Sequence, residues 1–167
     1  MRQAERGELV VIAFQLNRRP IQISVAPRCH LAEMLREQLL LTGMHLSCEH
    51  GVCGACNVMV NGVVIRACLM LAVQVDGAEV RTIEGLTADG TIADLQREFV
   101  ARNALQCGFC TPGMLMTAHE LLAQQPAPSR EEIRIALSGN YCRCTGYHSI
   151  VDAIETVARK RRGAGPG

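Results

Sequence analysis

Cys107-Gly-Phe-Cys110-Thr-Pro-Gly113 is the stretch around which this 167-residue chain is organised, and Cys142-Arg-Cys144-Thr-Gly-Tyr147 is its distant complement. Together the two stretches offer four thiols, as a Cys-x-x-Cys pair and a Cys-x-Cys pair. A second set stands upstream, so that eight of the nine cysteines fall into two groups of four: this set is Cys48, Cys53, Cys56 and Cys68. We interpret the pattern as two iron–sulfur clusters in one small protein, which indicates an electron relay rather than a site of bond chemistry.

The upstream set has the spacing Cys-x4-Cys-x2-Cys, followed by eleven residues and then Cys68. This is the spacing of plant-type [2Fe–2S] proteins. Gly51 and Gly54 lie inside the loop and permit both a close approach to a cluster and a positive φ. The alternative is a four-cysteine zinc site, which more often uses two Cys-x-x-Cys knuckles. Cys48 and Cys53 are too far apart for such a knuckle, so the spacing favours iron and sulfide.

The downstream set is less decisive, because 31 residues separate its Cys-x-x-Cys pair from its Cys-x-Cys pair. Cys110 directly precedes Thr111-Pro112, which predicts the start of a helix. The positive end of a helix dipole lowers the pKa of a thiol and suits an anionic cluster. Arg143 can face outward and offset the cluster's charge. On spacing alone, zinc and [2Fe–2S] are nearly even for this set.

Cys29 belongs to neither set, and we expect it to be a partly buried free thiol. The histidines show no ligand spacing with one another, so we predict that none of them binds metal. His30 could cap the helix that follows it. The histidines are His30, His45, His50, His119 and His148.

Two kinds of pattern divide the chain. Strands are predicted over 9–16, 21–25, 58–60, 63–65 and 79–83, with a helix over 31–41. Helices are then predicted from Thr91, whose Thr-x-x-Asp resembles a capping box, from Thr111, from Ser129 and from His148 or Ser149. The fold class is α+β, with a cluster domain over 8–83, a linker or ordered crossover over 84–90, a helical domain over 91–162 and a flexible tail over 163–167.

Charge and hydropathy exclude some classes of partner. Seventeen basic and sixteen acidic residues leave a net charge of +1, which argues against nucleic acid or a membrane as the main ligand. Arg159-Lys160-Arg161-Arg162 is better explained as a helix C-terminus that favours cations than as an interaction tail. Without a secretory signal or an apolar run of 18 residues, we expect a cytoplasmic chain, where nine cysteines indicate metal rather than disulfides.

Three motifs in order resemble the iron–sulfur part of the xanthine dehydrogenase (molybdenum hydroxylase) family: Cys48-Glu-His-Gly-Val-Cys53-Gly-Ala-Cys56, Gln106-Cys107-Gly-Phe-Cys110-Thr-Pro-Gly-Met114 and Asn140-Tyr-Cys142-Arg-Cys144-Thr-Gly-Tyr147. The length resembles the family's separate small subunit, as in carbon monoxide dehydrogenases, quinoline or isoquinoline oxidoreductases and 4-hydroxybenzoyl-CoA reductases. Asn57 stands where the family often has Thr, and Tyr141 where it often has Leu.

The resemblance implies a β-grasp ferredoxin domain followed by a four-helix-bundle domain, each holding one [2Fe–2S] cluster. The first cluster would be bound by Cys48, Cys53, Cys56 and Cys68, and the second by Cys107, Cys110, Cys142 and Cys144. It also implies a large partner with molybdopterin-bound molybdenum, contacted by Gln106, and a medium partner with FAD, assembled as a dimer of heterotrimers. Electrons would pass from molybdenum to the helical-domain cluster, then to the first cluster and on to FAD.

The family's substrates differ, and Glu-His-Gly-Val between the first two cysteines leans towards an N-heteroaromatic or an aldehyde rather than carbon monoxide. Two other functions compete with that of a hydroxylase subunit. One is a stand-alone ferredoxin-type carrier, which would need an exposed and usually acidic docking face. The other is a zinc-stabilised binding module without a redox role.

Overall fold

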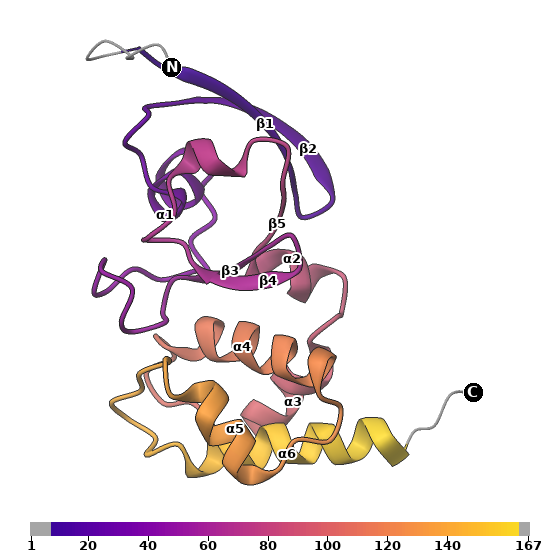
Figure 1. Ribbon diagram of the computed structural model, residues 1–167. Helices are drawn as coiled ribbons and strands as arrows, with labels where there is room; N and C mark the ends of the chain where they lie inside the picture. The colour runs from indigo at the N-terminus through magenta and orange to yellow at the C-terminus, as the bar shows by residue number, and fades with distance from the viewer. Residues whose placement is uncertain (1–7, 164–167) are drawn as a thin grey trace.

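A five-stranded sheet occupies one end of the molecule and a group of helices the other (Figure 1). The computed structural model describes residues 8–163. The strand order is β2-β1-β5-β3-β4, with β1 and β5 parallel and the other neighbours antiparallel. The strands are β1 (Val10–Leu16), β2 (Arg19–Val25), β3 (Asn57–Val60), β4 (Val63–Arg66) and β5 (Glu79–Arg81). The α+β class predicted from the sequence is confirmed.

The first hairpin forms because its apolar residues alternate. Ile12, Phe14 and Leu16 of β1 point into the core of the sheet half, whereas the residues between them are exposed. The hairpin turns at Asn17 and Arg18, and both residues have a positive φ. The Asn17 side chain then accepts a hydrogen bond from the Thr82 backbone N–H at 2.9 Å, which fixes the turn against the chain that leaves the sheet.

The helix predicted over 31–41 is shorter than expected. It consists of α1 (Leu31–Glu33) and one π-helical stretch, η1 (Met34–Gln38). The helix ends after that stretch, because Leu40 takes a positive φ of 56°. The Leu41 N–H then donates to the Leu35 carbonyl, six residues back, at 2.8 Å. His30 occupies the N-cap position, but its side chain makes no capping hydrogen bond there.

The end of the sheet half also differs from the prediction. A short 3₁₀ helix, η2 (Ala72–Val75), precedes β5, and β5 ends at Arg81 instead of residue 83. Helix α2 (Ile83–Ala88) follows at once, so the segment over 84–90 contains most of a helix. Thr82 is the N-cap of α2, and the Asn17 side chain holds it.

Four helices make up the other half: α3 (Ala93–Ala101), α4 (Thr111–Gln124), α5 (Arg130–Leu137) and α6 (His148–Gly163). The capping box at Ser129 is present, since the Glu132 N–H donates to the Ser129 hydroxyl at 3.2 Å and the Glu132 carboxylate accepts from the Ser129 N–H at 2.6 Å. The box predicted at Thr91 is wrong. The Thr91 hydroxyl donates to Asp89 instead, and α3 begins at Ala93.

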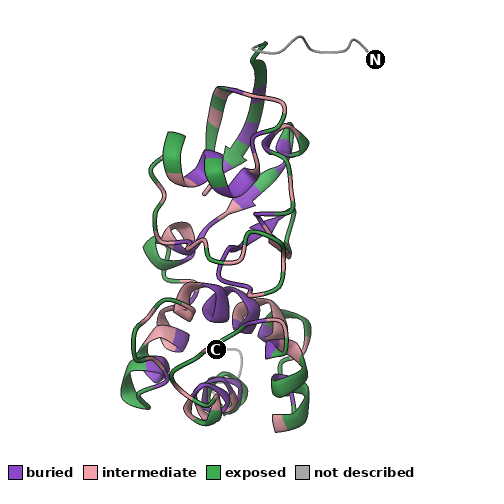
Figure 2. Cartoon of the chain, turned by 90° about the vertical axis from the view of Figure 1, so that its left-hand side faces the viewer, coloured by how far each residue is buried: buried purple, intermediate pink, exposed green. Residues whose placement is uncertain are grey.

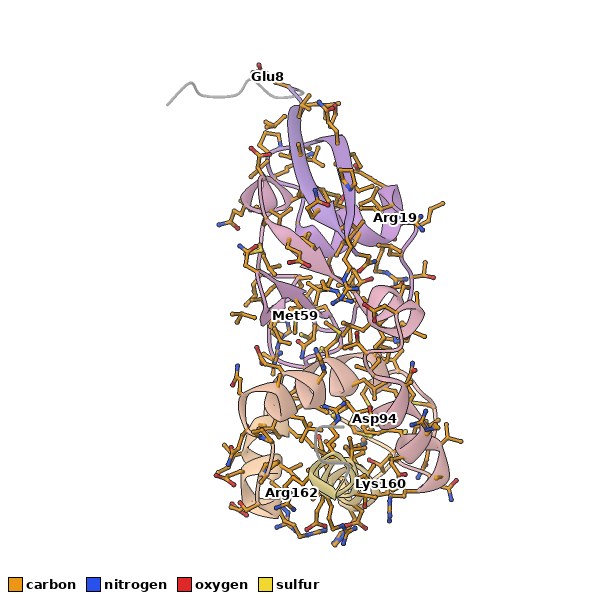
Figure 3. The ribbon with its side chains drawn as sticks, turned by 90° about the vertical axis from the view of Figure 1, so that its right-hand side faces the viewer. Glu8, Arg19, Met59, Asp94, Lys160 and Arg162 are labelled. Atoms are coloured by element: carbon orange, nitrogen blue, oxygen red, sulfur yellow. The ribbon has the colours of Figure 1, made fainter. Side chains whose placement is uncertain are left out.

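The basic run near the C-terminus serves the fold. Arg161 on α6 donates two hydrogen bonds to Asp94 on α3, at 2.7 and 2.9 Å, and Lys160 pairs with Glu98. These pairs hold α6 against α3. Figure 3 labels Asp94 and Lys160 in the helical half of the molecule. The tail predicted over 163–167 lies, except for Gly163, outside the described residues. No helix within residues 8–163 is long and apolar enough to cross a bilayer.

Strand β3 separates two hydrophobic cores. Val58 and Val60 pack into the core of the sheet half with α1, whereas Met59, between them, packs into the core of the helices. All four residues of β3 are buried because α4 covers the face of the strand that would otherwise meet solvent. Figure 2 shows the buried residues concentrated where the two halves meet.

Three glycines allow the two halves to approach this closely. A Cβ at Gly54 would lie 2.6 Å from the Gly139 carbonyl oxygen, and a Cβ at Gly113, in the first turn of α4, would overlap the Gly54 carbonyl. In both cases the obstacle is backbone, which cannot rotate away as a side chain can. Residues 54 and 113 therefore have no room for a side chain, whereas a Cβ at Gly139 would meet the end of the Arg66 side chain.

We predict that Gly113→Ala destabilises the full chain by about 1–3 kcal/mol, the usual cost of forcing an extra carbon into a packed interior. The matched control is Gly163→Ala at the end of α6, where an added Cβ meets nothing, and we expect a change within about 0.5 kcal/mol. Urea unfolding followed by circular dichroism measures both. Equal stability of the two variants would contradict the close approach described above.

Candidate metal centres

The first set of thiols lies in the loop over 48–56 and just after β4. Gly51 and Gly54 have φ values of 83° and 74°, so the loop uses the left-handed conformation that the sequence predicts for them. The loop curls tightly enough for the Cys53 N–H to donate to the Cys48 sulfur at 3.3 Å. The Ala67 N–H donates to the Cys56 carbonyl at 3.2 Å, which brings Cys68 beside Cys56.

Burial and backbone donors divide the thiols of this set. Burial would raise the pKa of Cys48, but the backbone N–H groups of Cys53, His50 and Val52 outweigh it and lower that pKa to about 6. Burial raises the pKa of Cys56 to about 12, with help from the neighbouring thiols of Cys68 and Cys53 and against a hydrogen bond from the Cys68 backbone. Backbone amides already point at the Cys48 sulfur, as they do towards the thiolates of a bound cluster.

The second set lies at one end of the helical half. Cys107 and Cys110 precede α4, with Gly108 between them at a φ of 81°, and Cys142 and Cys144 lie in the loop from α5 to α6. The Cys144 and Cys107 sulfurs are 3.6 Å apart. The pairs that are distant in the sequence therefore converge as predicted.

Tyr147 organises the second loop of this set. Its hydroxyl accepts a hydrogen bond from the Cys142 N–H at 2.8 Å and donates to the Asn140 carbonyl at 2.9 Å. Thr145 donates to the Cys142 sulfur from both its N–H, at 3.4 Å, and its hydroxyl, at 3.1 Å. Arg143 is exposed between the two cysteines, as the sequence predicts.

One electrostatic expectation for this set is wrong. Cys110 occupies the N-cap position of α4, yet burial raises its pKa to about 12, with help from the thiols of Cys142 and Cys107. Burial removes water from around the thiol, which favours its uncharged form. At Cys142, burial acts in the same sense, but the two hydrogen bonds from Thr145 outweigh it and lower the pKa.

In each set the side-chain hydrogen bonds between thiols join them in two pairs, although the charges of the other thiols in the set also act on them. The neighbours are Cys48 with Cys53, Cys56 with Cys68, Cys107 with Cys144, and Cys110 with Cys142. Within residues 8–163, no three His, Cys, Asp or Glu side chains converge as they would on a single ion. Two pairs per set suit two bridged irons, each of which takes two thiolates. All four thiols of the second set line one cavity of about 300 Å³, and Cys53 reaches it from the first set.

A direct hydrogen bond joins the two sets. The Tyr141 N–H, next to Cys142, donates to the Cys53 carbonyl at 2.8 Å. Beneath it, a buried polar network crosses the same junction: Asn57 donates to the Thr117 hydroxyl at 2.9 Å, and that hydroxyl donates to the Asn140 side chain at 3.1 Å.

Arg66 closes the network by donating to the Asn57 side chain and, at 2.7 Å, to the Gly139 carbonyl. Sequence reasoning missed Arg66, Thr117 and Asn140 as parts of the junction, and noted Asn57 only as a departure from the family. For Asn57, Arg66 and Thr117 the signal was a polar residue in a largely apolar strand or helix, and that signal does not identify a partner; Asn140 lies in a loop and gave no such signal.

The remaining residues singled out from the sequence differ in exposure. Gln106 and Cys107 are both exposed, beside the cavity of the second set. Cys29 is a free thiol that is 4% exposed and packs in the core of the sheet half. Its thiol donates to the His30 carbonyl at 3.5 Å and accepts from the Gln38 amide at 3.9 Å.

Models of two protein families match the chain. The "2Fe-2S iron-sulfur cluster binding domain" matches residues 31–103, and the "[2Fe-2S] binding domain" matches residues 82–155. Each set of thiols lies within one of these matches.

Proteins of known activity match along most of the chain. The small subunit of nicotine 6-hydroxylase from Paenarthrobacter nicotinovorans is 51% identical over 148 residues, which are 89% of either chain. The iron-sulfur-binding subunit of xanthine dehydrogenase from Escherichia coli O157:H7 is 42% identical, over 89% of this chain and 94% of that one. In the crystal structure of quinoline 2-oxidoreductase from Pseudomonas putida 86, one chain superposes with a TM-score of 0.87 at 50% identity, over 93% of this chain and 98% of that chain.

We predict that Cys29→Ser leaves both metal centres intact, because Cys29 lies in a hydrophobic core and outside both sets. The variant should keep about four irons per chain and both paramagnetic signals on reduction. The matched change is Cys110→Ser, which should lose the signal of the second centre alone. Loss of a centre in Cys29→Ser would mean that the ligands are wrongly assigned.

Proposed function

Because the chain belongs to the small iron–sulfur subunits of the xanthine dehydrogenase (molybdenum hydroxylase) family, we propose that it relays electrons within a larger enzyme. The relay runs from a molybdopterin centre on one partner, through two [2Fe–2S] clusters on this chain, to FAD on another. The observation that carries the proposal is the arrangement of eight thiols as two sets of two pairs, joined by one backbone hydrogen bond.

The proposed ligands are the eight cysteines of the two sets. The cluster of the sheet half takes Cys48, Cys53, Cys56 and Cys68, and the cluster of the helical half takes Cys107, Cys110, Cys142 and Cys144. Four thiols in two pairs, with backbone donors on the outer sulfurs, form a donor set that fits a two-iron cluster. We assign the first cluster to residues 8–83 and the second to residues 91–162.

Exposure supports an order for the relay. Cys107 and Cys144 are exposed, whereas in the first set Cys48 and Cys53 are half-buried and Cys56 and Cys68 are buried. The helical-half cluster would thus meet a partner surface through its outer pair of ligands. Gln106 is exposed beside Cys107, and its amide can both donate and accept hydrogen bonds, which suits contact with a polar pterin. We therefore assign the face around residues 106–114 to the molybdenum subunit and the loop over 48–56 to the FAD side.

The holoenzyme is proposed to act on an N-heteroaromatic compound. Nicotine, xanthine and quinoline, named for the three relatives above, all contain such a ring. Activity of the holoenzyme on an aldehyde or on carbon monoxide, and not on an N-heteroaromatic compound, would contradict this assignment. We also propose a cytoplasmic enzyme built as a dimer of heterotrimers, each with a large molybdopterin subunit and a medium FAD subunit. Purification of this chain with both partners tests that composition, and a stand-alone ferredoxin would purify without them.

We predict about four irons and an equal amount of acid-labile sulfide in the purified chain, since eight thiolates bind two two-iron clusters. Metal analysis, sulfide assay and electron paramagnetic resonance after reduction measure this directly. The two clusters should give two distinct signals. Stoichiometric zinc without sulfide would overturn the proposal and favour a structural zinc module.

We predict that substrate reduces the Cys48 cluster at least about tenfold more slowly in Cys107→Ser, which equals about 1.4 kcal/mol in barrier height. The reason is that the helical-half cluster, the first point of the relay, would have lost one of its ligands. Gln106→Ala should slow the same step less, by about fivefold, as for the loss of one hydrogen bond.

The measurement is rapid mixing of the assembled complex with substrate, followed at the spectrum of the Cys48 cluster. Dithionite should reduce that cluster at the normal rate in both variants. Gln22→Ala, an exposed glutamine on β2, serves as the control for Gln106→Ala. Wild-type reduction by substrate in Cys107→Ser would show that the proposed order of the relay is wrong.

A further inference from the structure

His45 connects the sheet half to the segment that carries Cys107 and Cys110. Its Nδ1 lies 2.8 Å from the Phe109 carbonyl oxygen. A carbonyl can only accept, so the hydrogen is on Nδ1 and the imidazole donates. The two rings also stack, with centroids 4.7 Å apart and an angle of 19° between their planes. Phe109 itself is 44% exposed, so the imidazole covers one face of a ring that otherwise meets solvent.

The backbone of His45 is held by the loop of the first thiol set. Its N–H donates to the Ala55 carbonyl at 3.3 Å, and Ala55 lies between Cys53 and Cys56. One residue therefore contacts the loop of the first set through its main chain and the loop of the second set through its side chain. Phe109 also lines the cavity of the second set, so movement of this residue changes the walls of that cavity.

The second set has two segments, and each is tied to the sheet half in a different way. The segment with Cys142 and Cys144 is held by the bond from the Tyr141 N–H to the Cys53 carbonyl, which is entirely backbone. The segment with Cys107 and Cys110 is held by the side chain of His45. Arg66 adds a side-chain tie near the Cys142–Cys144 segment through the Gly139 carbonyl, whereas substitution of His45 removes the tie to the Cys107–Cys110 segment and leaves the main chain unchanged.

We propose that His45 is a positioning residue: it fixes the Cys107–Cys110 segment against the first thiol loop and so sets the environment of the helical-half cluster and its spacing from the other cluster. This rests on the proposed function, because it assumes that both sets bind [2Fe–2S]. His45 donates no electron and binds no metal. Its hydrogen bond and its stacked ring hold two of the four ligands of the helical-half cluster in register with the other half.

The test uses the full chain with both clusters loaded and compares three substitutions. His45→Phe keeps a ring for stacking but removes the donor, His45→Asn keeps an amide donor near the Nδ1 position but removes the ring, and His45→Ala removes both. His148→Phe, at an exposed histidine on α6 that takes no part in the contact, is the matched control. Iron content, the two paramagnetic signals and amide exchange over residues 105–114 are measured for each.

In His45→Ala we expect exchange over 105–114 to be about tenfold faster, which equals about 1.4 kcal/mol. The midpoint potential and line shape of the helical-half cluster should change, while those of the Cys48 cluster stay the same. His45→Asn should restore much of the wild-type exchange, and His148→Phe should resemble the wild type. His45→Phe should fall between the alanine and asparagine variants.

Two failures remain distinguishable. If the wild-type chain holds no iron and sulfide, the proposed function itself is wrong. If the wild type holds both clusters, but His45→Ala leaves exchange over 105–114 and the helical-half signal unchanged, then the relay stands and the role of His45 is refuted. Equal changes at both clusters would also refute it, because they would indicate a general loss of stability.

Discussion

The hydrogen bond from the Tyr141 backbone N–H to the Cys53 carbonyl is the contact on which the arrangement of this molecule depends. It joins two main-chain segments that each carry a ligand candidate. Such a bond requires both backbones to approach without side chains between them, and Gly54, Gly113 and Gly139 supply that space. The polar groups buried by the approach then need partners, and Asn57, Arg66, Thr117 and Asn140 satisfy one another across the junction.

The sequence predicted what is local and missed what is not. The spacing of cysteines within a loop, the two neighbouring strands over 58–60 and 63–65 and the capping box at Ser129 are patterns of a few residues, and each appears in the structure close to where it was predicted. The bonds of the network that cross the junction, Asn57 to Thr117 and Arg66 to Gly139, join residues 60 and 73 positions apart, so no short pattern could identify them. Helix α2 was missed because the Asn17 side chain, 65 residues away from Thr82, holds its start.

The thiols themselves illustrate the same limit. Position at a helix N-terminus predicted an acidic Cys110, but burial, which depends on the whole fold, decided the opposite. Each set combines a thiol held towards its charged form by hydrogen bonds, Cys48 or Cys142, with one kept protonated by burial, Cys56 or Cys110. Binding of a metal to such a set must release the protons of the inner thiols, so cluster insertion is linked to pH.

Strand β3 has a consequence for how the chain came to be one protein. Its consecutive side chains belong alternately to two hydrophobic cores, Val58 and Val60 to one and Met59 to the other. Neither half can unfold without exposing apolar surface of the other half. The two halves should therefore unfold in one cooperative transition. The halves are thus poor modules for recombination. Replacement of either half by a homologue would have to preserve the packing of β3 against the core of the other half.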